Sequence, residues 1–454
     1  MNANSEDHPT PPRPDALRWR AALGGVVLVA LLARGVLLAQ ALGSSGLDDP
    51  DNYLPLARSL AAGGGFVLNG RPTAYRPPLY PLVLAPVVAT LGGRAGWGVA
   101  ALHLALGAGT VLLTAAAARG WGLTPGAALA AAAVVACDPV LAAQSRSVMT
   151  ETLAAFLTAA SLAALTRPGA SGAALGGLAL GLGALCRPST LAAAPLTAAA
   201  AWVASPGPSR ARAGRAALLL AATAATLAPW AARNARALGE PVCTTTHGGY
   251  TLYLANNPVY YDEVVNGPAG AVWAGANQRL WWDSVYRMTR GLSEPEADRV
   301  LRAAAVRVAA SRPRDFARAS LARLGRFWGL APAAAVYPRA VRLVTAAFTA
   351  PLWVALAVGL CRRRVWAWPR SAAPFTVLAL TAVHSAYWTD LRMRSTVVPA
   401  VALIAASASF RSEKGAGVWE NSTPPGRRFA RPQGWKKNGK TGGISFPNPR
   451  ESLG

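Results

Sequence analysis

The sequence is poor in acidic residues and in lysine. Of its 454 residues, 20 are Asp or Glu, 45 are Lys or Arg, and only 14% are charged. Soluble domains carry about 25% charged residues, so this composition argues against an ordinary soluble enzyme. The hydrophobic fraction of 53% also excludes a chain that is disordered throughout.

Cysteine and histidine are scarce as well. The cysteines Cys137, Cys186, Cys243 and Cys361 are widely separated and show no CxxC spacing. Neither a disulfide framework nor a zinc site is predicted. The net charge is +25, and many of the arginines lie in short connections between apolar segments. They are not interleaved with stacking aromatic residues, so we expect no nucleic-acid binding.

Apolar windows occupy most of the chain. They cover approximately residues 21–42, 79–92, 97–118, 124–143, 148–166, 170–186, 188–204, 213–231, 340–361, 371–388 and 395–410. Such lengths predict an all-α polytopic membrane protein with about 10–11 transmembrane helices. The first window follows Arg13, Arg18 and Arg20 and is longer than the apolar region of a signal peptide, which favours a retained first span.

Arginines in short connections predict the orientation of the spans. They place the N-terminus (1–20), residues 205–215 and the connection at 362–370 in the cytoplasm. One window between the first external loop, 43–78, and the 205–215 connection then cannot be a full span. Window 79–92 is short and contains two prolines, so we expect an interfacial, re-entrant or half-spanning helix.

This topology predicts three parts. Residues 1–20 form a cytoplasmic N-terminus, residues 21–410 form the membrane domain, and residues 411–454, which hold all four lysines, form a disordered basic cytoplasmic tail. The outer face receives 43–96, 144–147, the Arg187 turn, 232–339 and 389–394. Loop 232–339 is rich in arginine, but loops longer than about 60 residues escape the charge rule. Within it, Glu294 to Arg326 is predicted to be helical, with a capping box of Ser293 and Glu296.

The first external loop contains three of the five acidic residues between positions 21 and 239. These are Asp48, Asp49 and Asp51, and Tyr53 follows. Clustered carboxylates at the mouth of a bundle suit a general base, because burial and mutual repulsion raise a carboxyl pKa. A solvated acidic loop in which Asp51 caps a helix explains the same spacing equally well.

Arginines at the same face are candidate phosphate ligands. Arg76 follows Tyr75 in a proline-rich segment that ends at Tyr80 and Pro81, and the prolines fix the direction of the segment. Arg187 lies at an Arg-Pro turn between two apolar windows. A guanidinium stays charged and binds phosphate bidentately. The alternative for Arg76 is a side chain that reaches lipid headgroups.

Glu151 opens another apolar window, where an unpaired carboxylate is costly. We expect Arg146 or Arg187 to be its partner, in a functional or a purely structural pair. Further polar groups at this face are Arg233 and Asn234, the loop from Cys243 to Pro258, and Arg392 and Arg394. The hydroxyl, aromatic and amide groups of the 243–258 loop fit a carbohydrate-facing surface as well as an ordinary one.

In this order, the motifs resemble the GT-C class of integral-membrane glycosyltransferases, in particular bacterial relatives of dolichyl-phosphate-mannose protein mannosyltransferases and of the aminoarabinose transferases that modify lipid A. The similarity rests on the Asp49 to Tyr53 spacing, the following ARSL and GGF runs, RPPLYP at 76–81, MTE at 149–151, GLGALCRP ending at 188, and PWAARN at 229–234. It extends from Leu47 to about Pro399.

The resemblance implies transfer of a sugar from a polyprenyl-phosphate donor to an envelope lipid, glycan or protein acceptor at the outer face of the bacterial plasma membrane, with inversion. It implies an Asp of the first external loop as base, and Asp49 has the expected offset from an aromatic residue. In the family an acidic residue often follows this Asp, whereas here Pro50 follows. Asp48 and Asp51 therefore stay candidates.

The remaining roles follow from the same resemblance. Glu151 is expected in the catalytic group, Arg76, Arg187, Arg392 and Arg394 are expected to bind the donor phosphate, and Tyr53, Tyr75, Tyr80, Arg233 and Asn234 are expected to contact substrate. No cofactor is required, although the carboxylates at 48, 49, 51 and 151 have the chemistry to hold a divalent metal.

Two other function classes fit the composition. One is a flippase or transporter of lipid-linked saccharides, which would show internal symmetry and charges near the midplane. The sequence has no such repeat, and its rare charges gather at one face. The other is a GT-C scaffold without catalysis, which the Pro50 departure keeps open.

Overall fold

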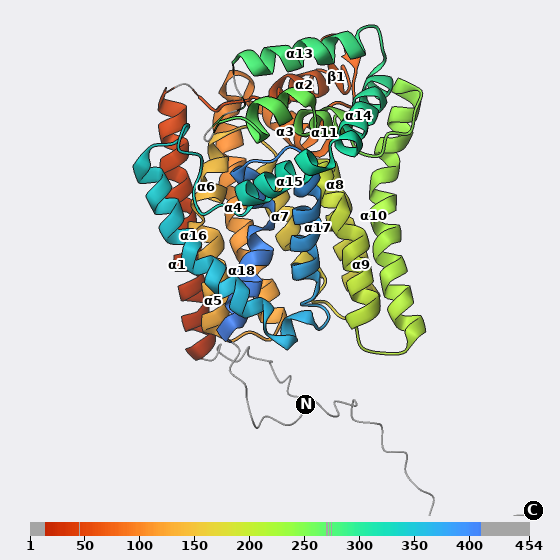
Figure 1. Cartoon of the computed structure of the whole chain (residues 1–454). Coiled ribbons are helices and arrows are strands. Elements are labelled where there is room, and N and C mark those ends of the chain that lie inside the picture. The colour runs from red at the N-terminus through yellow and green to blue at the C-terminus, as the bar shows by residue number, and fades with distance from the viewer. Residues whose placement is uncertain (1–13, 45, 269–270, 272, 274, 410–454) are drawn as a thin grey trace, which may run out of the picture. The chain divides into compact units, whose positions relative to one another are not determined.

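The computed structural model describes residues 14–44, 46–268, 271, 273 and 275–409. These residues are mostly helical (Figure 1). The predicted tail at 411–454 and residues 1–13 lie outside the described residues. The α-helices are α1 (Pro14–Ser44), α2 (Tyr53–Ala61), α3 (Leu79–Leu91), α4 (Ala95–Gly120), α5 (Pro125–Cys137), α6 (Pro139–Ala143), α7 (Glu151–Ala164), α8 (Gly169–Cys186), α9 (Ala193–Ala204), α10 (Ser209–Leu238), α11 (Gly248–Ala255), α12 (Pro258–Tyr260), α13 (Ala276–Thr289), α14 (Glu294–Ser311), α15 (Pro313–Phe327), α16 (Arg339–Leu360), α17 (Ala372–Ala386) and α18 (Val398–Ala406).

Short helical segments and one hairpin connect these helices. The segments are η1 (Gly92–Arg94), η2 (Gln144–Arg146), η3 (Pro188–Ala192), η4 (Tyr261–Val265), η5 (Arg363–Trp366), η6 (Leu391–Val397) and η7 (Ser407–Ser409). Strands β1 (Val67–Leu68) and β2 (Arg71–Pro72) pair antiparallel. Their turn uses Asn69 and Gly70 at positive φ, the residue types that a tight hairpin requires.

Six helical stretches within the described residues are long and apolar enough to cross a membrane. They are Leu17–Ser44, Leu79–Gly120, Gly169–Cys186, Ser209–Leu238, Arg339–Leu360 and Leu391–Ser409. The bent pair of α5 and α6 makes a seventh if it counts as one span, and α7 and α17 are shorter apolar helices. The chain is an all-α polytopic membrane protein, as the apolar windows predict. Several of the predicted windows form helices shorter than a full span.

Window 79–92 forms a helix that turns back on its successor. Helix α3 has 13 residues, or about 20 Å, and ends at Gly92, whose φ of 50° favours glycine. The Tyr80 hydroxyl lies 2.8 Å from Nε2 of His103, which brings the start of α3 beside the middle of α4. The short length agrees with the prediction that this window is not a full span.

Helix α5 ends within the apolar bundle, and a buried arginine satisfies its last carbonyls. Pro139 cannot donate a backbone hydrogen bond, so the chain bends by 42° between α5 and α6. Arg34 of α1 is 1% exposed and donates to the carbonyls of Val135 and Ala136 at 3.0 and 2.9 Å. A helix break inside an apolar region needs such donors, because no water is present to replace them.

The bundle packs through small residues. Helices α8 and α10 approach closely at Gly177, where an added Cβ would lie 2.3 Å from the carbonyl oxygen of Leu219. The Thr223 hydroxyl donates to the Gly177 carbonyl at 3.0 Å across the same contact. Small residues and interhelical hydrogen bonds are typical of membrane helix pairs, where burial of apolar surface supplies little driving force. The central core is formed mainly by α4, α5, α17 and α18.

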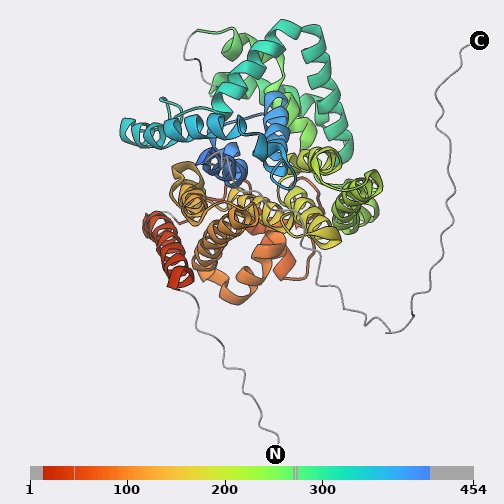
Figure 2. The ribbon, with the colours of Figure 1, turned by 90° about the horizontal axis from the view of Figure 1, so that it is seen from below.

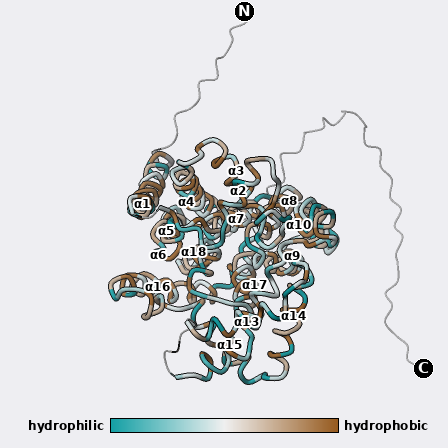
Figure 3. The backbone as a smooth tube through the Cα atoms, turned by 90° about the horizontal axis from the view of Figure 1, so that it is seen from above, coloured by the Kyte–Doolittle hydropathy of each residue, from teal (hydrophilic) through white to brown (hydrophobic). Residues whose placement is uncertain are grey.

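Helices α11 to α15 form a layer over one end of the bundle, together with α2 (Figure 1). The view from below shows the bundle helices nearly end-on (Figure 2), and the chain around α13 to α15 is more hydrophilic than α1 or α4 (Figure 3). The predicted helix from Glu294 is present, with its capping box of Ser293 and Glu296. The aromatic core of this layer includes Tyr253 and Trp281.

Candidate active site

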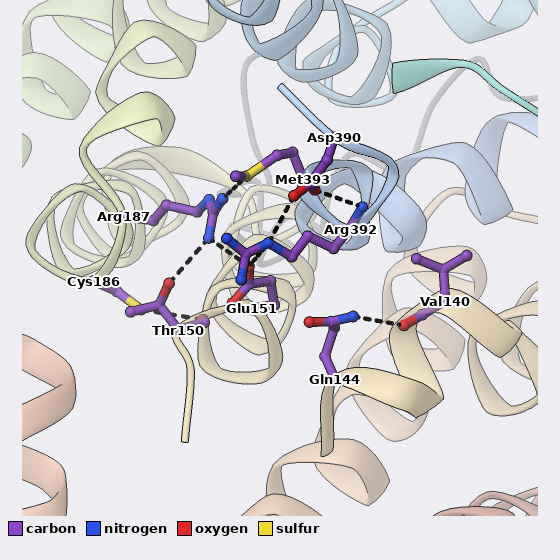
Figure 4. Close-up of polar contacts among 9 residues, drawn as sticks. All are labelled: Val140, Gln144, Thr150, Glu151, Cys186, Arg187, Asp390, Arg392 and Met393. Carbon is purple, nitrogen blue, oxygen red and sulfur yellow. Dashed lines mark hydrogen bonds and ion pairs between the residues drawn. The ribbon is translucent and has the colours of Figure 1, made fainter. Parts of the chain in front are cut away.

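Segments far apart in the sequence meet at the layered end of the bundle. The backbone oxygen of Asp48 accepts from the Val148 N–H at 2.7 Å, which joins the first loop to the start of α7. Glu151, the first residue of α7, contacts Arg187 after α8 and Arg392 in η6 (Figure 4). The predicted convergence of the rare polar residues at one end of the bundle is therefore present.

Asp49 holds the beginning of α2. Its two carboxylate oxygens accept the backbone N–H groups of Tyr53 and Leu54, each at 2.8 Å. Asn52 precedes the helix with a φ of 58°, so the chain turns sharply between the aspartate and the helix. Burial raises the pKa of the Asp49 carboxyl, although the two N–H donors act in the opposite direction. The side chain is half-buried and pairs with no arginine among the described residues.

The neighbouring aspartates have other environments. Asp51 forms an ion pair with Arg76 at 2.8 Å, and its backbone oxygen accepts from Nε of Arg76 at 3.0 Å. The prediction that Asp51 caps the helix is wrong, because Asp49 provides the cap. The Asp48 side chain is exposed. Only Asp49 combines partial burial with freedom from an arginine partner.

Glu151 lies at the centre of the arginine cluster. Its side chain is fully buried, and Oε1 lies 3.1 Å from Nη1 of Arg187 and 3.8 Å from Nε of Arg392. Arg187 also donates to the Thr150 hydroxyl at 3.0 Å and to the sulfur of Met393 (Figure 4). The predicted pairing of Glu151 with Arg187 is present. Because the carboxylate of Glu151 is fully buried, this conformation does not support the predicted place of Glu151 in the catalytic group.

Arg392 is the most exposed member of this cluster. Its side chain is 35% exposed and bonds to the carboxylate of Asp390, which is 44% exposed. The Asp390 carboxylate also accepts the Arg392 backbone N–H at 3.0 Å. Arg187 is only 12% exposed. A phosphate that approaches from outside therefore meets Arg392 first.

Arg394 does not join the cluster. It is 2% exposed, donates to the carbonyl of Gly329 and the hydroxyl of Thr349, and lies over the ring of Trp353. It thus fastens η6 to α16 and to the connection before it. The prediction that Arg394 binds the donor phosphate is not supported, because its guanidinium is already enclosed by protein.

Two predicted substrate-binding tyrosines are buried in the core. Tyr53 and Tyr80 are 3% and 0% exposed, and their rings meet edge to face at 5.3 Å. The hydroxyl of Tyr80 is engaged with His103, whose other nitrogen lies 2.9 Å from the Ser145 carbonyl. These rings join α2 to α3, and their burial in this conformation does not support the predicted contact with substrate. Burial raises the pKa of the Tyr53 hydroxyl above its ordinary value.

Arg233 and Asn234 stabilise the layer at the end of α10. Arg233 donates to the carbonyls of Phe66 and Thr73 at 2.7 and 2.8 Å, which ties α10 to the hairpin. Asn234 is fully buried and donates to the Val242 carbonyl at 2.7 Å. Both residues have a structural role in this conformation, and the predicted contact with substrate is not supported.

Tyr75 belongs to an aromatic cluster that extends from Arg76 towards the surface. Its ring meets His247 edge to face at 4.3 Å, and His247 stacks on Tyr250 at 4.8 Å. Tyr250 then contacts Trp282, which is 51% exposed on α13. The sequence indicated either a carbohydrate-facing or an ordinary surface for the 243–258 loop, and it did not indicate the contact of this loop with α13.

The histidine of this aromatic cluster stays neutral. Burial and the nearby Arg76 guanidinium lower the pKa of His247 to about 3. It therefore carries no charge at physiological pH, and it is not suited to exchange a proton with a substrate there.

Glu294 was not among the predicted site residues, yet it fixes the geometry of the Tyr75–Arg76 segment. One carboxylate oxygen accepts from the Ala74 N–H at 2.9 Å and from the Thr246 hydroxyl at 3.0 Å. Only the helix start at Ser293 marked this position in the sequence. Within the described residues, no three Asp, Glu, His or Cys side chains form a group that could hold a metal ion.

The fold and the site together define an integral-membrane protein with a carboxylate and an arginine cluster at one end of a helical bundle. Residues 77–203 match the family model of the dolichyl-phosphate-mannose-protein mannosyltransferases. The match covers less than half of the chain; it includes Glu151 and Arg187 and leaves Asp49 outside. It confirms the resemblance that the motifs predict and supports the class of membrane glycosyltransferases.

Two solved structures are similar in arrangement. One is the oligosaccharyltransferase of Archaeoglobus fulgidus tethered with an acceptor peptide containing the NVT sequon; the TM-score is 0.49 at 16% identity, over 85% of this chain and 49% of that chain. The other is ArnT from Cupriavidus metallidurans in the apo state, with a TM-score of 0.37 at 15% identity, over 86% of this chain and 78% of that one. The chain thus spans about half the length of the archaeal protein. No curated protein matches it significantly.

Proposed function

We propose that this protein transfers a sugar from a polyprenyl-phosphate donor to a hydroxyl of an envelope lipid, glycan or protein, with inversion of the anomeric centre. The site lies at the outer face of the plasma membrane. The observation that carries the proposal is the position of Asp49. Its carboxylate accepts two backbone N–H groups at the start of α2, is partly exposed and has no arginine partner within the described part of the chain. The backbone of Asp48 joins the same loop to the end of α7 that bears Glu151.

Asp49 is the proposed general base. Each of its oxygens accepts one backbone N–H and keeps a further lone pair, so the carboxylate can also accept the proton of an acceptor hydroxyl. A raised pKa makes it a stronger base than an ordinary aspartate. The backbone contacts fix the direction of the Asp49 carboxylate without neutralising its charge. The Asp51 carboxylate, in contrast, forms an ion pair with Arg76.

The reaction is a single displacement. The acceptor oxygen loses its proton to Asp49 and forms a bond to the anomeric carbon. The bond from that carbon to the phosphate oxygen breaks, and the lipid phosphate leaves with the bonding electrons. Arg392 and Arg76 are the proposed ligands of the departing phosphate, because guanidinium groups stabilise the charge that develops on it. No protonation of the leaving group is needed.

Glu151 and Arg187 support this arrangement as positioning residues. The buried Glu151 carboxylate holds Arg187 and Arg392 at one end of the bundle, so the arginines need not reorganise when phosphate binds. Asp390 is the more exposed partner of Arg392. We expect the donor phosphate to replace Asp390 as that partner, since the exchange leaves the guanidinium paired.

The aromatic cluster from Tyr75 to Trp282 is the proposed surface for the acceptor. Aromatic faces pack against the apolar faces of sugar rings, and this cluster begins at the residue next to Arg76. Its end at Trp282 is exposed, so a glycan or glycolipid can approach it. This favours an acceptor that carries sugar over a simple lipid alcohol.

The test uses membranes that contain the full chain, incubated with a panel of polyprenyl-phosphate sugars. We expect a product from one donor, and nuclear magnetic resonance should give it the anomeric configuration opposite to that of the donor. Mass spectrometry of envelope lipids and glycans from a deletion strain would identify the acceptor. A product with retained configuration would contradict the single displacement, and absence of any product with every donor would contradict the transfer itself.

A further inference from the structure

A cavity with arginines in its lining opens at the end of the bundle opposite to the candidate active site. Helix α7 begins at Glu151 and α8 ends at Cys186, so the start of α7 and the end of α8 lie at the candidate active site. The connection between them therefore lies about 20 Å away, one helix length. A cavity of about 210 Å³ is present there, between this connection, the α9–α10 connection, α10 and the segment before α17.

The cavity contains two arginines and no acidic residue. Arg167 and Arg215 line it, and no Asp or Glu is among its lining residues. The Nη1 atom of Arg215 is buried, yet it has no hydrogen-bond partner among the described residues. A buried guanidinium nitrogen without a partner is costly beside a membrane. An anion in the cavity would remove that cost.

The start of α8 supplies further donors to the same cavity. Gly169 and Ala173, in its first two turns, line the cavity. The residue before the helix is Pro168, and no side chain caps the first-turn N–H groups. Free N–H groups and the helix dipole make a helix start favourable for phosphate. The arginines and the helix start thus point to the same kind of ligand independently.

Most of the other lining residues are apolar. They include Leu165, Trp368 and Pro369, so the cavity offers both charged and apolar contacts. A free phosphate ion would use the charged contacts only. A phospholipid uses both, since its headgroup carries the charge and its glycerol and upper acyl carbons contact the apolar residues.

We propose that this cavity binds the phosphodiester group of an anionic phospholipid, held by Arg167, Arg215 and the first turn of α8. The site is separate from the proposed glycosyl transfer and does not depend on it. Its occupant stabilises the junction of α7, α8 and α10.

The test compares the full chain in nanodiscs of phosphatidylcholine alone and of phosphatidylcholine with phosphatidylglycerol. We expect phosphatidylglycerol to raise the melting temperature of the wild type, and native mass spectrometry to detect the retained lipid. The R167Q/R215Q variant should bind phosphatidylglycerol at least about tenfold more weakly and lose most of the temperature shift. The matched control is R210Q, an exposed arginine of α10 outside the cavity, which should respond as the wild type does.

Three outcomes decide the proposal. An equal phosphatidylglycerol response in wild type and R167Q/R215Q would overturn the site. Inorganic phosphate that reproduces the whole shift in phosphatidylcholine nanodiscs would overturn the lipid assignment. If the double variant does not fold, R167Q alone is informative because its side chain is exposed, and an unchanged response in that variant would also overturn the site.

Discussion

The three aspartates of the first loop lie within four positions, yet each meets a different environment. Asp48 is exposed and contributes its backbone, Asp51 is paired with Arg76, and Asp49 receives two N–H donors from α2. Asp49 is therefore the best candidate for a general base, because its carboxylate is both accessible and held in place. Asp49 also accepts the first N–H groups of α2, so a useful substitution must remove its basicity and keep this structural contact.

The pH dependence of transfer should report the Asp49 carboxyl. Burial raises its pKa above the ordinary aspartate value, and the base must be deprotonated to act. Activity is therefore lost as pH falls through this raised pKa and is present above it. We expect the acid limb of kcat/KM, measured with a fixed donor, to lie above the range of an ordinary aspartate and to keep its position in Asp48→Asn. An acid limb that moves in Asp48→Asn would argue for Asp48 as the base.

Replacement of Glu151 by Gln should weaken the site and the fold together. The change leaves Arg187 and Arg392 without their shared buried carboxylate, and removal of one partner of a buried ion pair costs about 3–5 kcal/mol. We expect a lower melting temperature in detergent. In the folded fraction, the KM for the lipid donor should rise more than kcat falls, because Glu151 positions the phosphate ligands.

The control for Glu151 is Asp390→Asn. Asp390 is 44% exposed and contacts the same Arg392, so its loss should change stability by about 1 kcal/mol or less. If Glu151→Gln changed only the melting temperature and left the donor KM as in the wild type, the positioning role would be wrong and Glu151 would be purely structural.

At the scale of elements, close approach between helices determines where the site residues lie. Helix α8 carries Arg187 at its end, and α8 is placed by its contact with α10 at Gly177. Helix α10 in turn carries Arg233, which holds the hairpin beside the Tyr75–Arg76 segment. Both sides of the candidate site thus depend on this helix pair.

The substitution Gly177→Val tests this contact. A Cβ at this position would lie 2.3 Å from the Leu219 carbonyl oxygen, so the helices must separate. We expect a destabilisation of about 1–3 kcal/mol or more, observed as a lower melting temperature together with lower transfer. Gly24→Val on α1 is the control, because a Cβ there meets nothing within 4 Å. Equal stability of the two variants would show that the α8–α10 contact is loose.

At the scale of the whole molecule, the sequence predicts the membrane class and the gathering of polar residues at one end. Both follow from local properties, namely the length of apolar windows and the position of rare charges relative to them. The pairing of Glu151 with Arg187 was also predictable, because an unpaired carboxylate in an apolar window is costly. The helix start at Ser293 was predictable because its capping box is a local sequence pattern. Window 79–92 is short in the structure for the reason that its prolines and length indicate.

The roles of single residues at the site were less predictable. Tyr80 looked available in the sequence but is buried against His103, and Arg394 is enclosed by α16 and its preceding connection. Arg233 binds backbone carbonyls of a hairpin more than 150 positions earlier in the chain. Spacing cannot indicate which long-range neighbour a side chain meets, and that neighbour decides whether the residue is accessible.

The central claim is that Asp49 is the base of a sugar transfer. Its most direct test is the rate of transfer from the active polyprenyl-phosphate donor by Asp49→Asn, with Asp48→Asn as the matched control. Asparagine keeps one acceptor for the N–H groups of α2 but cannot take a proton. We predict that Asp49→Asn folds, binds donor and loses at least about a hundredfold in kcat, while Asp48→Asn stays close to the wild type. Transfer by Asp49→Asn at the wild-type rate would contradict the account.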